Sequence, residues 1–238
     1  MFRKAPLLVL IVLVGIVAVA PGVHANTGSP PPVRTASGAP IVRDWPAEHR
    51  RLADWHLTLV DPLYTVGSAY APTDLTSVSN AGIAGRGSVR KLVLADLRAL
   101  DRAARAAGIR LRVVSAYRSY ATQKATFDYW VQQEGWSTAV RYSARAGHSE
   151  HQLGTTVDFS FVGGADPWNY ADFGQTRAGA WLKANAWRYG FVMSYPKGKE
   201  QYTGYGYEPW HFRYFGRALA AAHRTSGLVP RYWLWRRN

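Results

Sequence analysis

The stretch from residue 147 to residue 161, GHSEHQLGTTVDFSF, contains the pattern that decides the fold. Its second half alternates, with Val157 and Phe159 on one side and Asp158 on the other, which predicts a strand. A carboxylate within a strand needs a polar partner. His151 lies seven residues upstream, where a loop enters the strand, so its imidazole and the Asp158 carboxylate could share a metal ion.

Helical and extended segments surround this strand in mixed order. Apolar spacing predicts a helix over residues 88–107, with Ser88 as its N-cap, and further helices over 119–134, 176–189 and 216–224. Alternating patterns predict further strands at 109–114, 191–194 and 210–214. The two kinds of element do not alternate strictly. We therefore expect an α+β fold, with a central antiparallel sheet that carries the site and helices packed on one face and at the edges.

The composition limits the class of protein. The chain has 238 residues, is 47% hydrophobic and 18% charged, and contains no cysteine. This length suits one domain with a linker, and the apolar content excludes wholesale disorder. The lack of cysteine excludes disulfides, thiolate metal sites and a cysteine nucleophile. It does not exclude export, because a domain of this size can be stable without disulfides.

The first 25 residues have the three parts of a secretory signal peptide. Arg3 and Lys4 precede an apolar run over residues 7–20, and small residues precede a cleavage point after Ala25. The run is shorter than the roughly 20 residues of a bilayer span, although an uncleaved anchor is the alternative. We therefore expect the protein to be exported, to the cell envelope or the extracellular space.

The rest of the chain divides once more. Residues 26–43 (NTGSPPPVRTASGAPIVR) are rich in Pro, Gly, Ser and Thr and lack periodicity, which predicts a disordered linker. Residues 44–238 have a dense mixed pattern without a second linker. They predict one folded domain, which we expect to be a monomer.

The charge suggests an acidic counterpart. The chain carries 29 Lys and Arg against 15 Asp and Glu, a formal net charge of +14. Export and the dispersal of these charges argue against nucleic acid. Fixed positive charge attracts acidic polymers, so the anionic bacterial envelope is the expected partner, while a generally basic soluble surface explains the charge equally well. Contact with a membrane is expected only through an uncleaved signal segment.

A second polar group stands in residues 207–213, YEPWHFR. His211 lies on a predicted strand, and with His151 and Asp158 it makes a set of two imidazoles and one carboxylate. Zinc accepts these ligands, and a catalytic zinc site keeps a fourth position for water. Glu208 is then an unliganded carboxylate that could take the proton of that water.

Spacing alone leaves alternatives open. Taken singly, a histidine is more often a packed or surface residue than a ligand, and a strand-end hydrogen bond would explain Asp158. His148 stands three residues from His151 and competes with it as a ligand.

Three segments resemble the motifs of VanY-type D-alanyl-D-alanine metallocarboxypeptidases, the zinc peptidases of peptidoglycan. Residues 149–158 (SEHQLGTTVD) are similar to S-x-H-x-x-G-x-A-x-D, residues 208–211 (EPWH) to E-x-W-H, and residues 115–123 (SAYRSYATQ) to S-G-Y-R-S-x-x-x-Q. Their order and rough spacing match as well, and the resemblance covers residues 88–217.

This resemblance implies one zinc ion per chain, with His151, Asp158 and His211 as the ligands, and settles the choice against His148. It also implies that Glu208 is the general base. Residues 44–238 would then be a zinc D,D-carboxypeptidase-like domain.

The resemblance further implies that Arg118 faces the substrate, where it holds a carboxylate or stabilises charge on the scissile carbonyl. The planar fork of an arginine suits both tasks. Ser115, Gln123 and Ser149 are expected to bind substrate beside it. Thr156 stands where the family pattern has Ala, a departure that concerns specificity rather than the catalytic set.

The implied function is a secreted zinc peptidase that hydrolyses the terminal D-Ala-D-Ala bond of peptidoglycan stem peptides. The motifs leave open the same chemistry on another bond, as an L-Ala-D-Glu endopeptidase or an L,D-carboxypeptidase. A catalytically silent wall-binding module is the alternative from another class. The presence of Glu208 argues against it, because a purely structural zinc site has no use for a base.

Overall fold

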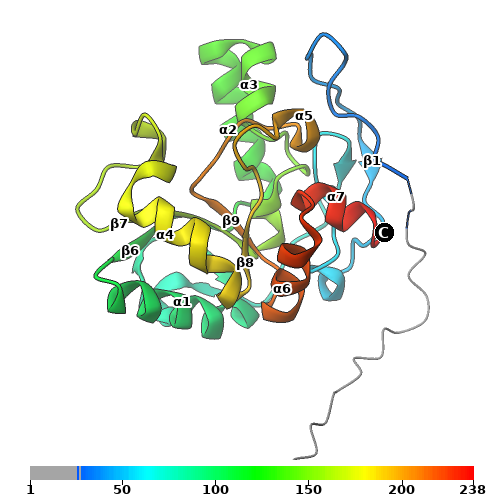
Figure 1. Cartoon of the computed structure of the whole chain (residues 1–238). Coiled ribbons are helices and arrows are strands. Elements are labelled where there is room, and N and C mark those ends of the chain that lie inside the picture. Colours follow the sequence, from blue (N-terminus) through cyan, green and yellow to red (C-terminus); the bar gives the residue numbers. More distant parts are fainter. Residues whose placement is uncertain (1–25, 27) are drawn as a thin grey trace, which may run out of the picture.

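A five-stranded sheet forms the centre of the structure, a computed structural model that describes residue 26 and residues 28–238 (Figure 1). The predicted signal peptide, residues 1–25, lies outside the described residues. In the part of the chain that is described, no helix is long and apolar enough to cross a membrane.

Helices and strands follow one another in mixed order, as the sequence predicts. The strands are β1 Trp45–Pro46, β2 Tyr64–Thr65, β3 Leu75–Ser77, β4 Ala84–Gly85, β5 Ser88–Arg90, β6 Leu111–Ser115, β7 Thr156–Phe161, β8 Phe191–Met193 and β9 His211–Tyr214. The helices are α1 Leu94–Ala106, α2 Tyr120–Glu134, α3 Trp136–Tyr142, α4 Arg177–Asn185, α5 Glu200–Thr203, α6 Arg217–Ser226 and α7 Pro230–Trp235.

The central sheet has the strand order β4-β6-β7-β9-β8. The pairs β6–β7, β7–β9 and β9–β8 are antiparallel, whereas β4 joins β6 in parallel at one edge. The α+β prediction is confirmed, with a sheet that is mixed rather than wholly antiparallel. Gly85 makes the parallel edge possible, because its φ is +114° and a Cβ there would overlap the carbonyl oxygen of Val113.

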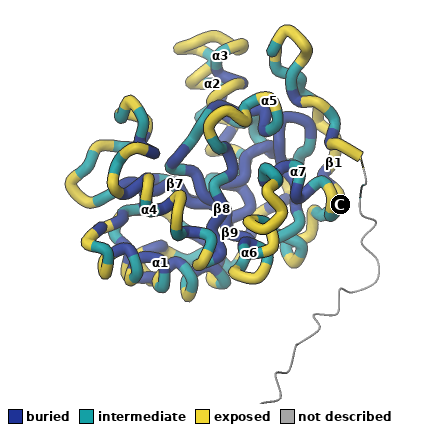
Figure 2. The backbone as a smooth tube through the Cα atoms, viewed as in Figure 1, coloured by how far each residue is buried: buried dark blue, intermediate teal, exposed yellow. Residues whose placement is uncertain are grey.

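The two faces of the sheet differ because side chains alternate along each strand. Val157 and Phe159 of β7 and Phe212 of β9 point into the main core, where α1 and α4 cover them. Leu97 and Leu100 of α1 are fully buried there, and burial of each such side chain contributes about 1.5–3 kcal/mol. Figure 2 shows the sheet buried and the outer surfaces of α1 and α4 exposed. The opposite face of the sheet is left for polar side chains.

Local signals locate the start of α2 but not the start of α1. The helix predicted over residues 119–134 is α2, and Ser119 is its N-cap, since its hydroxyl accepts a hydrogen bond from the N–H of Thr122 at 3.1 Å. Ser88 does not cap α1: it lies in β5, opposite Ser77 of β3, and α1 begins at Leu94. Pairing with a distant strand outweighs the local capping signal here.

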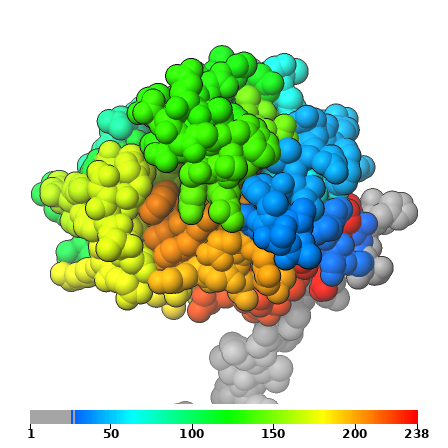
Figure 3. All heavy atoms as spheres, turned by 90° about the horizontal axis from the view of Figure 1, so that it is seen from above, coloured from blue at the N-terminus to red at the C-terminus, as the bar shows by residue number. Residues whose placement is uncertain are grey.

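Residues 28–43 pack along the domain instead of forming the predicted disordered linker. Val33 is fully buried, and Arg34 donates hydrogen bonds to the backbone carbonyls of Glu200 (3.2 Å) and Gly204 (2.9 Å). Gly204 leaves room for this close packing, because a Cβ on it would lie 2.5 Å from Cγ of Pro62 and 3.3 Å from Cβ of Val33. Figure 3 shows this blue arm against the orange segment that contains α5. Together with a hydrogen bond from Arg231 to the carbonyl of Pro31 (2.8 Å), these contacts hold a stretch of otherwise linker-like composition against the domain.

Two segments without a recognised motif complete the fold. In residues 44–66, Leu59 is buried, whereas Trp45 remains 43% exposed. At the other end of the chain, α7 buries Trp233 completely, and its ring stacks on Phe215 with the centroids 5.3 Å apart. The domain therefore includes both segments.

Candidate metal centre and active site

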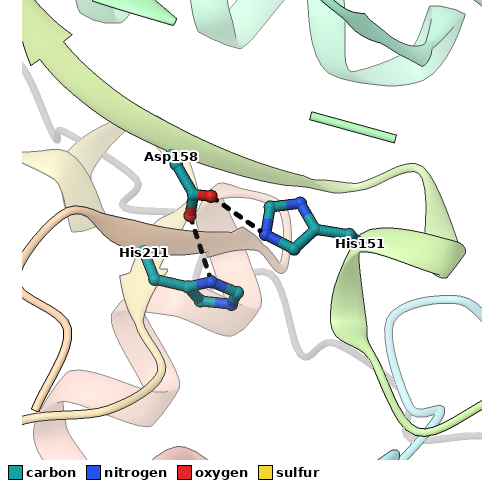
Figure 4. Close-up of side chains that lie close together, drawn as sticks. All are labelled: His151, Asp158 and His211. Carbon is teal, nitrogen blue, oxygen red and sulfur yellow. Dashed lines mark ion pairs between the residues drawn. The ribbon is translucent and has the colours of Figure 1, made fainter. Parts of the chain in front are cut away.

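The register between β7 and β9 brings two predicted ligands together. Asp158 of β7 lies directly opposite His211 of β9, so both side chains leave the same face of the sheet. His211 Nδ1 is 3.2 Å from Asp158 Oδ1. Figure 4 shows these two side chains and His151 directed toward one another.

A short turn positions the third residue, His151. Residues 150–153 form a 3-10 turn, and the Ser149 hydroxyl accepts a hydrogen bond from the N–H of His151 at 3.3 Å. Nδ1 of His151 lies 2.6 Å from the carbonyl oxygen of Ala116. This contact places the ring proton on Nδ1 and leaves the lone pair on Nε2, which is 3.1 Å from Asp158 Oδ2.

The three side chains offer a donor set that fits zinc. One ligand atom from each of His151, Asp158 and His211 lies within 4.8 Å of the other two. Within the described residues, His151 Nε2 and Asp158 Oδ1 are buried and make no hydrogen bond. Such orphaned atoms are costly unless something satisfies them. Two imidazole nitrogens and one carboxylate oxygen suit a zinc ion that keeps a position open for water.

Electrostatics favour the ligating forms of two of these groups. Burial would raise the pKa of Asp158, but the imidazoles of His151 and His211 hold it far below its usual range. Burial, aided by the charge of Arg118, lowers the pKa of His151 to about 4. For His211, hydrogen bonds to Asp158 and Glu150 outweigh burial and raise the pKa to about 10. A metal ion must therefore displace a proton from His211.

Glu208 lies at the rim of this cluster. Its Oε2 is 3.5 Å from His211 Nδ1, and its side chain is 16% exposed, against 3–6% for the three ligand candidates. Burial raises the pKa of Glu208 to about 7, although the charge of His211 opposes this. Its backbone N–H donates to the carbonyl of Tyr195 at 3.1 Å, which fixes the loop after β8. A carboxylate with a pKa near neutrality suits general-base work.

Arg118 reaches the cluster from the loop between β6 and α2. One of its terminal nitrogens is 3.8 Å from Asp158 Oδ2, and the other donates to Gln123 Oε1 at 2.9 Å. Gln123 in turn donates to the carbonyl of Ala144 at 2.7 Å. The Arg118 side chain is 25% exposed. Gln123 thus holds one nitrogen of the guanidinium, while the side chain as a whole remains partly accessible.

The three residues predicted to bind substrate have different surroundings. Ser115 ends β6 and pairs with Asp158 next to a β-bulge, where it is partly exposed. Gln123 is fully buried and Ser149 is 5% exposed. Gln123 and Ser149 therefore support the arginine and the histidine turn, and only Ser115 has an exposed position beside the cluster.

His148 is not part of the cluster. Its Nδ1 lies 2.7 Å from the carbonyl oxygen of Asp61, and its Nε2 lies 2.9 Å from Asp44 Oδ1. The ring therefore ties the N-terminal segment to the loop that precedes His151. This placement agrees with the choice of His151 over His148.

Glu150 was not predicted as a site residue from the sequence, although it contacts the cluster directly. Its Oε2 lies 2.9 Å from His211 Nε2, and its Oε1 accepts a hydrogen bond from Arg213 at 3.1 Å. Burial would raise the pKa of Glu150, but the hydrogen bond from His211 and the charge of Arg213 hold it at about 2. A glutamate beside a predicted ligand was the one available signal, and surface turns commonly have the same composition.

Thr156 lies on the same face of β7 as Asp158, as its spacing predicts. It pairs across the strands with Arg213. Its hydroxyl is buried and makes no hydrogen bond among the described residues. The departure from the family pattern therefore stands beside the cluster.

The chain is similar to known proteins of one family. The D-alanyl-D-alanine carboxypeptidase model (VanY) matches residues 86–217, more than half of the chain. The putative carboxypeptidase YodJ of Bacillus subtilis (strain 168) is 39% identical over 177 residues, which are 73% of this chain and 64% of YodJ. The chain thus spans slightly less than two thirds of the length of that relative.

Two solved structures are similar over most of the chain. The LdcB LD-carboxypeptidase has a TM-score of 0.69 at 30% identity, covering 87% of this chain and 94% of that one. A mutant of the vancomycin resistance D,D-pentapeptidase VanY, solved with Zn(II), has a TM-score of 0.64 at 30% identity, covering 76% of this chain and 99% of that one. Its Zn(II) agrees with the zinc cofactor expected from the donor set. The three motif segments all lie within the matched range, and we conclude that the chain belongs to the VanY family of D-alanyl-D-alanine carboxypeptidases.

Proposed function

We propose that the protein is a zinc-dependent peptidase that hydrolyses the terminal D-Ala-D-Ala bond of peptidoglycan stem peptides. The observation that carries this proposal is the convergence of His151, Asp158 and His211 on one point, with Glu208 at its rim. Family membership supports the reaction class. The substrate is named by analogy with the family.

The chain's own residues have distinct tasks in this reaction. Nε2 of His151, the Asp158 carboxylate and Nδ1 of His211 would hold one zinc ion per chain. When bound, zinc polarises a carbonyl and makes a water molecule more acidic. Glu208, with its pKa raised to about 7 by burial, accepts the proton of the attacking water and returns it to the leaving amine.

Arg118 supplies the recognition of negative charge. Its guanidinium is accessible and lies within 3.8 Å of Asp158, so a bound anion would sit next to the reacting bond. A carboxypeptidase substrate has its free carboxylate one residue away from the scissile carbonyl. A planar guanidinium can bind that carboxylate through two parallel hydrogen bonds.

Mass spectrometry of a purified pentapeptide stem after incubation tests the proposal. We expect the loss of one alanine, and a much slower reaction when the C-terminal carboxylate is replaced by an amide. Equal cleavage of acid and amide would remove Arg118 from the role of carboxylate reader. Cleavage between L-Ala and D-Glu would identify an endopeptidase, and no product with zinc bound would favour a silent wall-binding module.

L,D-carboxypeptidase activity is the second candidate, because the similarity to the LdcB LD-carboxypeptidase covers 87% of this chain. Such an enzyme removes the D-Ala that follows an L-centre in a tetrapeptide stem. Parallel assays on pentapeptide and tetrapeptide stems decide between the two. Preference for the tetrapeptide would reassign the specificity and leave the roles of Glu208 and the metal unchanged.

The proposed place of action is the cell envelope or the extracellular space. The signal-like pattern of residues 1–25 and the net charge of +14 support it, since the wall polymers of the envelope are anionic. N-terminal sequencing of the protein recovered from the producing cells and their medium tests this. An intact N-terminus in the cytoplasmic fraction would contradict export.

A further inference from the structure

Glu150 is a buried carboxylate that the proposed reaction does not use. It is 5% exposed and accepts three hydrogen bonds from side chains. Oε2 takes one from His211 Nε2 (2.9 Å) and one from the Ser194 hydroxyl (2.5 Å), and Oε1 takes one from Arg213 (3.1 Å). A carboxylate is retained in such surroundings only with this degree of compensation.

Arg213 connects this carboxylate to a part of the chain outside the family match. It is fully buried, and its guanidinium also donates to the backbone carbonyls of Trp55 (2.8 Å) and Thr58 (2.7 Å). It stands two residues after His211 in β9, on the same face of the sheet. The guanidinium therefore balances the charge of Glu150 and fixes its distance from β9.

The two ligand imidazoles differ in the group that contacts their second ring nitrogen. His151 Nδ1 meets the neutral carbonyl of Ala116, whereas His211 Nε2 meets the ionised carboxylate of Glu150. Once the Nδ1 proton has been displaced, the proton that remains on His211 Nε2, directed at Glu150, leaves the lone pair on Nδ1, the nitrogen that faces Asp158. A carboxylate partner also makes an imidazole a stronger donor to a metal than a carbonyl partner does.

We propose that Glu150 is a positioning residue that fixes the ring orientation and tautomer of His211 for metal binding. Ser194 and Arg213 hold Glu150 in place for this task. The inference rests on the proposed zinc function of the site. It adds a residue that touches neither substrate nor metal and acts through His211 alone.

Metal binding by a Glu150→Gln variant tests the proposal. The amide keeps the shape of the side chain and removes its charge. We expect the zinc dissociation constant, measured by competition with a chelator, to rise by about 10–100-fold. We also expect the visible absorption bands of the Co²⁺-substituted protein to change, because the geometry at His211 is altered. Glu134→Gln, at the exposed end of α2, is the matched control and should leave both quantities unchanged.

A purely structural role would give a different result. A variant with a lower melting temperature but wild-type zinc affinity and an unchanged Co²⁺ spectrum would overturn the proposal. If Glu150→Gln does not fold, Glu150→Asp keeps the charge that Arg213 needs and withdraws the oxygen from His211 by one methylene. A folded Glu150→Asp protein with wild-type zinc affinity and an unchanged Co²⁺ spectrum would overturn the proposal equally, and weaker binding would support it.

The role of Glu150 and the proposed function can be contradicted separately by these measurements. A wild-type protein that binds zinc but hydrolyses no stem peptide would contradict the function and leave the role of Glu150 intact. Wild-type zinc affinity and an unchanged Co²⁺ spectrum in an active Glu150→Gln protein would contradict the role of Glu150 and leave the function intact.

Discussion

At the scale of single residues, burial gives two neighbouring carboxylates different chemistry. Asp158 is surrounded by imidazoles that keep it ionised in spite of burial. Glu208 has fewer compensating contacts, so burial raises its pKa to about 7. Environments that separate the pKa values of two carboxyl groups commonly separate their roles. Here they favour Asp158 as a metal ligand and Glu208 as a proton acceptor.

Replacement of Glu208 by Gln should abolish most turnover and keep the fold and the zinc. The amide preserves the shape and removes only the basic oxygen, and general-base catalysis contributes typically ~10²–10⁴-fold. Initial rates on a pentapeptide stem, together with the zinc content of the same sample, measure this. A rate near that of the wild type at full zinc occupancy would exclude Glu208 as the base.

Replacement of two neighbouring histidines by Ala should have opposite effects. His151→Ala should lose zinc, because it removes a ligand atom. His148→Ala should keep zinc but lower the free energy of unfolding by about 1–3 kcal/mol, since Asp44 and Asp61 lose a hydrogen-bond partner. Metal analysis and denaturant unfolding of both variants measure these effects. Zinc lost from His148→Ala and kept by His151→Ala would reverse the assignment.

The sequence could predict those site residues that belong to a family motif. The resemblance to the family motifs implied His151, Asp158 and His211 as ligands, and the structure brings all three together. Glu150 could not be found in this way. Its partners Ser194 and Arg213 come from the residue that follows β8 and from β9, and only the folded sheet places them beside it.

At the scale of elements, α6 packs on α7 through a partly buried histidine. The ring of His223 lies edge-on to Trp233, with centroids 5.7 Å apart, and its Nε2 is buried without a hydrogen-bond partner among the described residues. Burial lowers the pKa of His223 to about 4, outweighing a hydrogen bond to the backbone of Leu228, and the charge of Arg237 adds to the shift. The neutral ring is therefore part of the packing between the two helices.

This packing should make stability depend on pH between about 6.5 and 4. The unfolded chain binds a proton near pH 6.5 and the folded protein only near pH 4, so stability is full above 6.5 and falls as the pH drops through this window. Across it, the wild type should lose about 2 kcal/mol more unfolding free energy than His223→Gln, which cannot be protonated. Urea unfolding of both proteins at several pH values measures the difference. Parallel pH profiles would show that His223 does not titrate between the two states.

Elements were predictable from the sequence where local signals and tertiary pairing agree. The strand Thr156–Phe161 and the Ser119-capped helix are cases of agreement. The pairs formed by β3, β4 and β5 were not predictable, because two- and three-residue strands have too few residues to show a period. The short C-terminal helix α7 was missed for the same reason.

At the scale of the whole molecule, the site depends on chain outside the family match. Arg213 bonds to the carbonyls of Trp55 and Thr58, and His148 bonds to Asp44 and the carbonyl of Asp61. The predicted domain boundary at residue 44 therefore keeps every one of these partners. Composition could not predict that the arm before this boundary would pack, because its partners, such as Arg231 and the carbonyl of Gly204, lie far away in the sequence.

Removal of residues 1–43 should lower stability but leave the metal site intact. All ligand candidates lie between His151 and His211, and Asp44 is retained. The truncated protein loses the buried Val33 and the two hydrogen bonds from Arg34 to α5 and Gly204. Part of that loss is offset because the arm no longer has to be ordered, so we expect a decrease of roughly 1–3 kcal/mol in unfolding free energy.

Three proteins test whether the arm stabilises the fold: this truncated protein, a Val33→Ala variant of the full chain and the wild type. Denaturant unfolding should place Val33→Ala between the other two, because it removes the buried side chain and keeps the arginine anchor. Zinc affinity should be equal in all three, since α5 and the arm contact none of the ligands. If the truncated protein is as stable as the wild type, the arm does not stabilise the fold and is only a linker. Loss of zinc on truncation would mean that the arm holds the metal site together, through the segment that leads from α5 to Glu208.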